Sequence, residues 1–223
     1  MSPRDPHADA PVRSAGAPLE EAAAVVLLLH GRGGSAEDIL SLAPHLDPGS
    51  DSGGGGRLAF RAPQASGNSW YPGSFLLPRE QNQPHLSSAL TLVHRTLDDL
   101  TAEVPPSRVF VLGFSQGACL AAESVLSREA GEPLGGVVCF TGGLIGDSVR
   151  IPGQAPRLDG MPVLLTGGDP DPHVPWARVE ETASAYRDRG AEVNAQRFPG
   201  KPHGVSAEEV ILAKDLLAPL LRG

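Results

Sequence analysis

The sequence predicts a single α/β domain with a mainly parallel β-sheet flanked by helices. Three observations lead to this prediction. Short apolar runs are mostly continuous rather than alternating, which is typical of strands that are covered on both faces. Segments with the period of an amphipathic helix lie between these runs, and strands that alternate with helices form parallel βαβ units. The length of 223 residues fits one compact domain.

Six apolar runs are predicted to be strands, and β-branched residues are common in them. They span residues 24–30, 58–62, 108–113, 136–141, 162–167 and 192–198. Residues 1–20 precede the first run and are rich in Pro, Ala, Asp and Arg. We expect this stretch to be a flexible N-terminus, or at most a short edge strand near Val12. The domain itself is expected over residues 21–223.

Four segments are predicted to be helices, over residues 84–100, 116–128, 175–189 and 206–221. In the first, apolar residues recur every three or four positions, at Leu86, Leu90, Val93, Leu97 and Leu100. The third has Pro175 near its first turn and Gly190 just past its end. Ser206 and Glu209 form a capping-box pattern that begins the last helix.

Composition excludes several classes of partner. The formal net charge is −8, which argues against nucleic acid and anionic membranes, because both need a basic surface. The longest apolar run, residues 22–29, is far shorter than the about 20 residues of a membrane-spanning helix. Residues 1–18 lack the apolar core of a signal peptide, so we expect a cytoplasmic protein without integral membrane association. Cys119 and Cys139 have no metal-ligand spacing, and neither a metal nor another cofactor is expected.

Residues 113–117 read Gly-Phe-Ser-Gln-Gly, a G-x-S-x-G pattern between a predicted strand and a predicted helix. In this context the pattern indicates a nucleophile elbow, in which Ser115 occupies a sharp strand-to-helix turn. The flanking glycines leave room for the turn, and the helix N-terminus favours negative charge beside the serine. The alternative is that Ser115 only caps the helix after a tight turn.

Candidate partners for Ser115 follow in the order expected after such an elbow, an acid and then a histidine. Asp169 and Asp171 follow the predicted strand 162–167, and His203 follows the last predicted strand. His203 would act as general base, and a carboxylate would orient it. The pattern alone does not separate the two aspartates, each of which also fits a turn or a helix cap. His173, beside the acids, is the second candidate for the base.

An ester carbonyl needs two hydrogen-bond donors for the oxyanion that forms during attack. The backbone N–H of Gln116, directly after the candidate nucleophile, is one candidate. The glycine-rich stretch 30–34 ends the first strong strand and is expected to supply the other. A phosphate-binding loop is the alternative there, but the G-x-x-x-x-G-K-[ST] pattern is absent.

Four motifs together resemble the α/β-hydrolase family of bacterial carboxylesterases, phospholipase/carboxylesterases and acyl-protein thioesterases. They are LLLHGRGG (27–34), GFSQG (113–117), GDPDPHVP (168–175) and KPHG (201–204). The resemblance implies a single-domain α/β-hydrolase fold with no large lid. It implies Ser115 as nucleophile, His203 as base and Asp171 rather than Asp169 as the acid. It also implies that the Arg32 N–H is the second oxyanion donor, at a position where the thioesterases typically have leucine.

The stretch 62–84 is expected to shape a substrate pocket, with Trp70, Tyr71, Phe75 and Leu76 as an apolar wall. His173 is expected at its rim. The alternative is a loop that packs these side chains onto the core. The stretch is more similar to the bacterial branch of the family than to true protein thioesterases.

We therefore expect a serine carboxylic-ester hydrolase that acts on short soluble esters through an acyl-enzyme. Lysophospholipase or thioesterase activity is the alternative within the same chemistry. A non-catalytic binding protein of this fold is the alternative outside it, and a dienelactone-type hydrolase is disfavoured because such enzymes usually have cysteine at the elbow. The oligomeric state stays open between a monomer and a homodimer, because Trp176 fits either a core or an interface.

Overall fold

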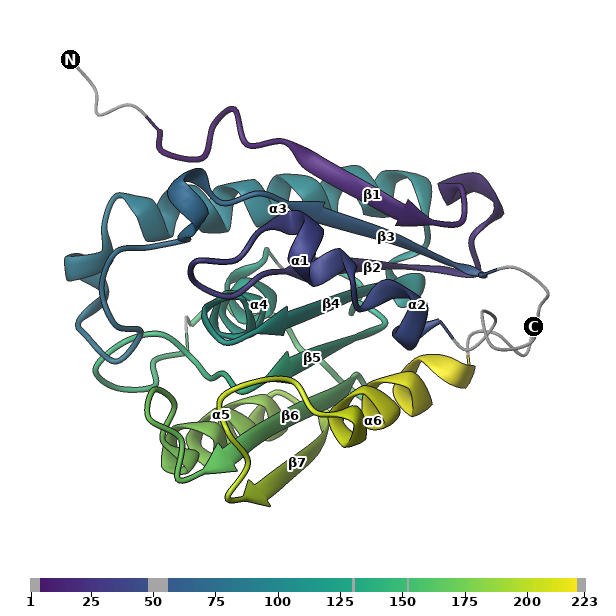
Figure 1. The fold of residues 1–223 in the computed structure, drawn as a ribbon. Helices are drawn as coiled ribbons and strands as arrows, with labels where there is room; N and C mark the ends of the chain where they lie inside the picture. Colours follow the sequence, from purple (N-terminus) through teal and green to yellow (C-terminus); the bar gives the residue numbers. More distant parts are fainter. Residues whose placement is uncertain (1–4, 48–55, 130, 152, 220–223) are drawn as a thin grey trace.

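The predicted strands form one seven-stranded sheet in the computed structural model, which describes residues 5–47, 56–129, 131–151 and 153–219. The strands are β1 (Val12–Gly16), β2 (Ala24–Leu29), β3 (Leu58–Pro63), β4 (Val109–Phe114), β5 (Gly136–Phe140), β6 (Pro162–Asp169) and β7 (Glu192–Pro199). Their order across the sheet is β1-β3-β2-β4-β5-β6-β7. β1 pairs antiparallel with β3, and the other pairs are parallel (Figure 1).

Helices cover both faces of the sheet. They are α1 (Ala36–Leu40), α2 (Ala43–Leu46), α3 (His85–Glu103), α4 (Gln116–Ser127), α5 (Trp176–Asp188) and α6 (Ala207–Leu217). Helices α1, α2 and α6 lie on the face toward the viewer in Figure 1, and α3, α4 and α5 lie behind the sheet. No helix in the described ranges is both long enough and apolar enough to cross a membrane.

The continuous apolar pattern of the central strands has a direct structural cause. All six residues of β2 are buried, and its side chains alternate between the two helical layers. Val25 and Leu27 pack in the core that contains α3, α4 and α5, whereas Val26 and Leu28 pack in the core that contains α1, α2 and α6. A strand buried on both faces needs apolar residues at every position, as the sequence predicted.

The predicted elements are present, with boundaries that differ by a few residues. The capping box is confirmed, since Ser206 Oγ accepts from the Glu209 N–H and the Glu209 carboxylate accepts from the Ser206 N–H. Described helix α6 ends at Leu217, and the last residues of the predicted helix lie outside the described ranges. Helices α1 and α2 were not predicted, because elements of 5 and 4 residues are too short to show a helical period.

The N-terminal segment is attached to the domain along most of its described length. Residues 12–16 form the edge strand β1, the second of the two alternatives considered for this stretch. His7 is 1% exposed, and its ring lies 5.8 Å from the Trp70 ring. Its Nδ1 accepts from the Ser66 N–H and its Nε2 bonds the Trp70 carbonyl. The expectation of a flexible stretch is therefore wrong for His7, whose ring is held by partners distant in sequence.

The sheet brings the candidate site together at one edge. The carboxyl ends of the parallel strands point to the left in Figure 1, so the loops that follow them share one side of the molecule. The register of the last two strands pairs Asp169 with Pro199. The loop that carries Asp171 begins directly after Asp169, and the loop that carries His203 begins directly after Pro199. These two loops therefore leave the sheet side by side.

Candidate active site

Ser115 lies in a backbone conformation that few residues adopt. It joins β4 to α4 with φ 54° and ψ −117°, and its N–H donates to the Phe140 carbonyl at 2.9 Å. A positive φ at a residue with a side chain is strained and persists only where the surrounding structure holds it. This geometry is the strand–turn–helix context that the G-x-S-x-G pattern requires.

The two glycines of the pattern are required by close packing of the backbone. A Cβ on Gly113 would lie 2.2 Å from the Gly117 carbonyl oxygen, and a Cβ on Gly117 would lie 2.1 Å from the Leu29 carbonyl oxygen. Both contacts involve backbone atoms, which cannot rotate away. The elbow therefore holds α4 directly against the end of β2.

We expect Gly117→Ala to lower the free energy of unfolding by about 3 kcal/mol, near the upper end of the usual cost of overpacking. Alanine is the better helix former, so a loss of stability would come from the clash and not from propensity. Gly131→Ala is the matched control, because a Cβ there meets nothing within 4 Å. Denaturant unfolding of both variants checks this, and equal stabilities would contradict the packing argument.

Three of the predicted residues form one hydrogen-bonded chain. His203 Nε2 lies 2.9 Å from Ser115 Oγ, and His203 Nδ1 lies 2.8 Å from Asp171 Oδ2. The other oxygen of Asp171 accepts from the backbone N–H groups of His173, at 2.8 Å, and Val174, at 2.9 Å. Both carboxylate oxygens are therefore occupied, and the imidazole is held between an acid and a hydroxyl.

Asp171 is suited to remain ionised. Its side chain is fully buried in this arrangement, and burial acts to raise the pKa of the carboxyl. The hydrogen bonds from the His173 N–H, the His203 ring and the Val174 N–H act in the opposite direction and prevail, so the pKa of Asp171 is lowered below its ordinary value. Asp169, the competing acid, instead forms an ion pair with Arg197 on the neighbouring strand.

The two predicted oxyanion donors line the cavity that contains Ser115. In the loop after β2, the Gly33 N–H donates to the Asn68 carbonyl and the Gly34 N–H donates to the Gly31 carbonyl. The N–H groups of Arg32 and Gln116 have no hydrogen-bond partner in the described part of the chain. Two free backbone donors beside a candidate nucleophile are the elements expected of an oxyanion hole.

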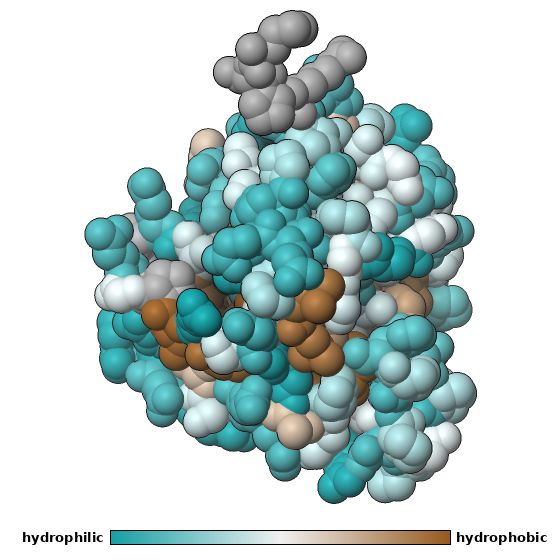
Figure 2. All heavy atoms as spheres, turned by 90° about the vertical axis from the view of Figure 1, so that its left-hand side faces the viewer, coloured by the Kyte–Doolittle hydropathy of each residue, from teal (hydrophilic) through white to brown (hydrophobic). Residues whose placement is uncertain are grey.

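The cavity at Ser115 measures about 710 Å³ and is bounded by the loops that follow the strands. Of the predicted pocket residues, Tyr71, Phe75, Leu76 and His173 line it. Figure 2 faces this edge of the sheet and shows hydrophobic side chains gathered across its middle, bordered by hydrophilic ones. The His173 ring packs edge-on against the His203 ring at 4.8 Å, which agrees with a position at the rim.

Trp70 was predicted to line the pocket, but it is not among the lining residues. Its side chain is fully buried, its Nε1–H donates to the His30 carbonyl at 2.8 Å, and its ring stacks obliquely on the His30 ring at 4.8 Å. The indole N–H thus has a hydrogen-bond partner inside the core, so it does not need contact with water at the cavity.

This chain matches the model of the phospholipase/carboxylesterase family over residues 12–220. It belongs to that family. The structure is similar to the crystal structure of a phospholipase/carboxylesterase from Dyadobacter fermentans DSM 18053, with a TM-score of 0.84 and 39% identity over 94% of this chain and 97% of that one.

Curated members of the phospholipase/carboxylesterase family are more distant. Carboxylesterase SOBER1 from Arabidopsis thaliana is 28% identical over 140 residues, which cover 60% of this chain and 59% of that protein. Acyl-protein thioesterase 1 from Neurospora crassa is 23% identical over 149 residues, which cover 65% of this chain and 60% of that protein. The chain spans 48% to 60% of the length of the curated relatives that it matches.

Arg32 holds the loop that forms one wall of the cavity. Its guanidinium donates to Ser69 Oγ at 3.2 Å, to the Pro72 carbonyl at 2.9 Å and to the Gly73 carbonyl at 2.6 Å. The same residue therefore lines the cavity and holds its wall with its side chain.

Two supporting networks were missed by the sequence analysis. The Gln116 side chain accepts from the Trp70 N–H at 3.0 Å and donates to the Tyr71 carbonyl at 2.7 Å, which ties the cavity wall to the elbow. Lys201 forms a buried ion pair with Glu209 at 3.1 Å and donates to the Gly204 carbonyl at 2.5 Å, which fixes both ends of the loop that carries His203. Neither network has a sequence motif, because the partners meet only in the folded chain.

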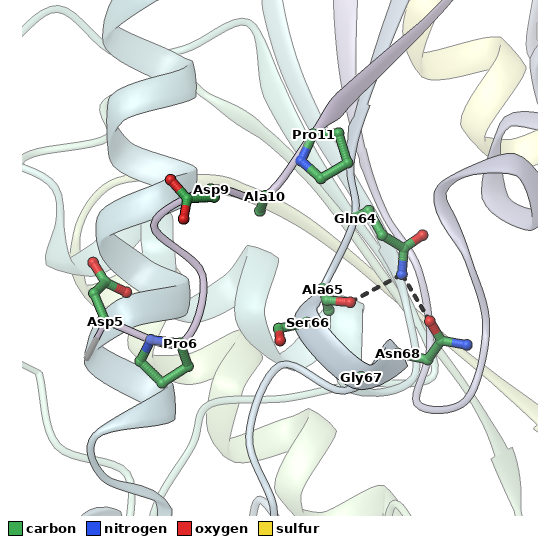
Figure 3. Close-up of a pocket in the computed structure, with 10 residues that line it drawn as sticks. All are labelled: Asp5, Pro6, Asp9, Ala10, Pro11, Gln64, Ala65, Ser66, Gly67 and Asn68. Carbon is green, nitrogen blue, oxygen red and sulfur yellow. Dashed lines mark hydrogen bonds between the residues drawn. The ribbon is translucent and has the colours of Figure 1, made fainter. Parts of the chain in front are cut away.

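A second cavity of about 590 Å³ lies between the N-terminal segment and residues 64–68 (Figure 3). Its wall contains the carboxylates of Asp5 and Asp9 and the amides of Gln64 and Asn68. The Gln64 amide donates to the Ala65 carbonyl and to Asn68 Oδ1, both at 3.0 Å. None of the predicted site residues lines this cavity. Within the described residues, no cluster of three or more His, Cys, Asp or Glu side chains is arranged to hold a metal ion.

Proposed function

We propose that this protein is a serine carboxylic-ester hydrolase that acts on short soluble esters through an acyl-enzyme. The observation that supports the proposal most directly is the hydrogen-bonded chain from Ser115 Oγ to His203 Nε2 and from His203 Nδ1 to Asp171 Oδ2. It joins a nucleophile, a base and an orienting carboxylate at hydrogen-bonding distance. Membership of the phospholipase/carboxylesterase family agrees with this chemistry.

In the first half of the reaction, Ser115 Oγ forms a bond to the ester carbonyl carbon while its proton passes to His203 Nε2. The carbonyl π electrons move to the oxygen, which accepts hydrogen bonds from the Arg32 and Gln116 N–H groups. Asp171 stabilises the imidazolium that forms. The bond between the carbonyl carbon and the alcohol oxygen then breaks, and the alcohol leaves with the proton from His203.

In the second half, water replaces the alcohol. His203 Nε2 removes a proton from water as the water oxygen attacks the acyl carbon, and the same two N–H groups hold the second oxyanion. The bond from the acyl carbon to Ser115 Oγ breaks, and the proton on His203 returns to the serine. The carboxylic acid leaves, and the free enzyme is restored.

The size and lining of the cavity support the proposal of short substrates. A volume of about 710 Å³ lies within the usual range for small-molecule sites, and Phe75, Leu76 and Val174 give it apolar surface. Relatives named carboxylesterase and acyl-protein thioesterase leave two acyl-transfer activities to compare. Arg32 holds the loop at the cavity wall through the Pro72 and Gly73 carbonyls, and we infer that this wall limits the length of the acyl chain.

A panel of p-nitrophenyl esters from acetate to palmitate tests the substrate class. We expect kcat/KM to be highest among acetate, butyrate and hexanoate and to fall steeply by decanoate, because we propose that the loop held by Arg32 limits the length of the acyl chain. S-butyryl thiocholine and a lysophosphatidylcholine measure the thioesterase and lysophospholipase alternatives. A value of kcat/KM that rises through palmitate, or a preference for the lysophospholipid, would contradict the short-ester proposal.

A further inference from the structure

Tyr71 has a buried hydroxyl that makes no hydrogen bond to an oxygen or nitrogen atom in the described part of the protein. The residue is 1% exposed and lines the cavity that contains Ser115. Tyr71 Oη is buried, makes no hydrogen bond to an oxygen or nitrogen atom there, and lies within hydrogen-bonding reach of the Cys119 thiol. The neighbouring Cys119 carries a thiol, which is only a weak donor and acceptor.

The other tyrosine of the chain shows how a buried hydroxyl is usually accommodated. Tyr186 is fully buried, and its Oη donates to the Ala122 carbonyl at 2.8 Å. A buried polar group without a partner destabilises the fold, whereas phenylalanine would fill the same space without that cost. The Tyr71 hydroxyl therefore points to a partner that the protein itself does not supply.

The hydroxyl lies beside Cys119, which lines the same cavity. Cys119 follows Ser115 by one turn of α4, on the same face of the helix, so the group beside it lies about 5 Å further along the helix axis than Ser115. Arg32 and His173, by contrast, are exposed and form the mouth. The leaving alcohol must escape to solvent at the mouth, so we place the acyl group that stays on Ser115 on the side of the cavity that Tyr71 and Cys119 line.

We propose that Tyr71 Oη donates a hydrogen bond to an acceptor oxygen carried by the acyl group, so that the preferred substrates are esters of alkoxy, oxo or hydroxy acids rather than of plain alkanoic acids. This inference rests on the proposed ester hydrolysis and names its substrate class. Phe75, Leu76 and Val174, on the same cavity, have no polar side-chain atoms that would compete for the acceptor. Burial raises the pKa of Tyr71 well above its ordinary value, which keeps the phenol protonated and able to donate.

Two pairs of esters with equal chain length test the inference. In each pair one CH₂ is replaced by oxygen: p-nitrophenyl methoxyacetate against butyrate, and p-nitrophenyl 3-methoxypropanoate against pentanoate. The measured quantity is the ratio of kcat/KM for the ether to kcat/KM for the alkanoate, in the wild type, Tyr71→Phe and Tyr186→Phe. Because every variant is measured with the same esters, differences in the intrinsic reactivity of the esters cancel when the ratios of the variants are compared.

In at least one pair we expect Tyr71→Phe to lower this ratio about tenfold, and Tyr186→Phe to leave it at the wild-type value. The melting temperature should be unchanged or raised in Tyr71→Phe and lowered in Tyr186→Phe, because only the second variant loses a satisfied hydrogen bond. The same ratio in the wild type and Tyr71→Phe for both pairs would overturn the inference, and water would then be the partner of the hydroxyl. If none of the four esters is hydrolysed, this result would instead contradict the proposed function.

Discussion

Ser115→Ala is expected to lower kcat for p-nitrophenyl butyrate by about 10⁴-fold or more, the range found when the nucleophile of a serine triad is removed. The methyl group has no lone pair for attack on the carbonyl, and it leaves His203 Nε2 without the hydroxyl that now lies 2.9 Å away. The free N–H groups of Arg32 and Gln116 are unchanged, so substrate binding should weaken much less than turnover. Steady-state kinetics measure both quantities.

Covalent labelling by a fluorophosphonate gives a second measurement of the same prediction. The reagent should modify the wild type at Ser115 and leave Ser115→Ala unlabelled. Ser127→Ala is the matched control, because Ser127 lies on the same helix and its hydroxyl donates to the Glu123 carbonyl at 2.8 Å. Labelling or turnover in Ser115→Ala at the wild-type level would rule out this serine. A wild type that resists labelling would favour the non-catalytic binding protein.

The sheet was predictable because the burial of each strand is visible in the apolar residues of that strand alone. A strand such as β2, buried on both faces, is apolar at each position, and the long helix α3 repeats its apolar residues at helical spacing. Helices α1 and α2 and the buried ring of His7 were not predictable in this way. The helices are shorter than two turns, and His7 is held by Trp70 and Ser66, about 60 residues further along the chain.

Some residues of the candidate site could likewise be predicted from the sequence, and others could be assigned only from the folded structure. Ser115 and His203 stand in motifs whose order along the chain could be recognised, and the structure brings them together. The choice between Asp169 and Asp171 depends on which side chain points at the imidazole, and spacing alone does not contain that direction. Trp70 and Tyr71 are adjacent and similar in sequence terms, and both are buried in the core, yet only Tyr71 also lines the cavity. Only tertiary packing separates them.

Asp171→Asn is expected to lower kcat by about 10³–10⁴-fold while the fold is retained. In the wild type, Asp171 Oδ1 accepts from the N–H groups of His173 and Val174, and Oδ2 faces His203 Nδ1. An asparagine would keep its one oxygen on the two backbone donors, because turning the amide would leave them facing an NH₂ group. Its NH₂ would then face His203 Nδ1 and favour the tautomer with the proton on Nε2. That tautomer cannot accept the Ser115 proton.

Asp169→Asn separates this explanation from a general effect of negative charge in the loop. Asp169 lies two residues away and pairs with Arg197, at a position where both side chains are partly exposed. Such a pair contributes about 0–1 kcal/mol to stability, so the variant should retain kcat within a few-fold of the wild type. A larger loss of kcat in Asp169→Asn than in Asp171→Asn would reverse the assignment of the acid. Equal losses would indicate that the charge of the loop matters, and not the tautomer of His203. A large loss confined to Asp171→Asn is expected because only this carboxylate contacts the imidazole.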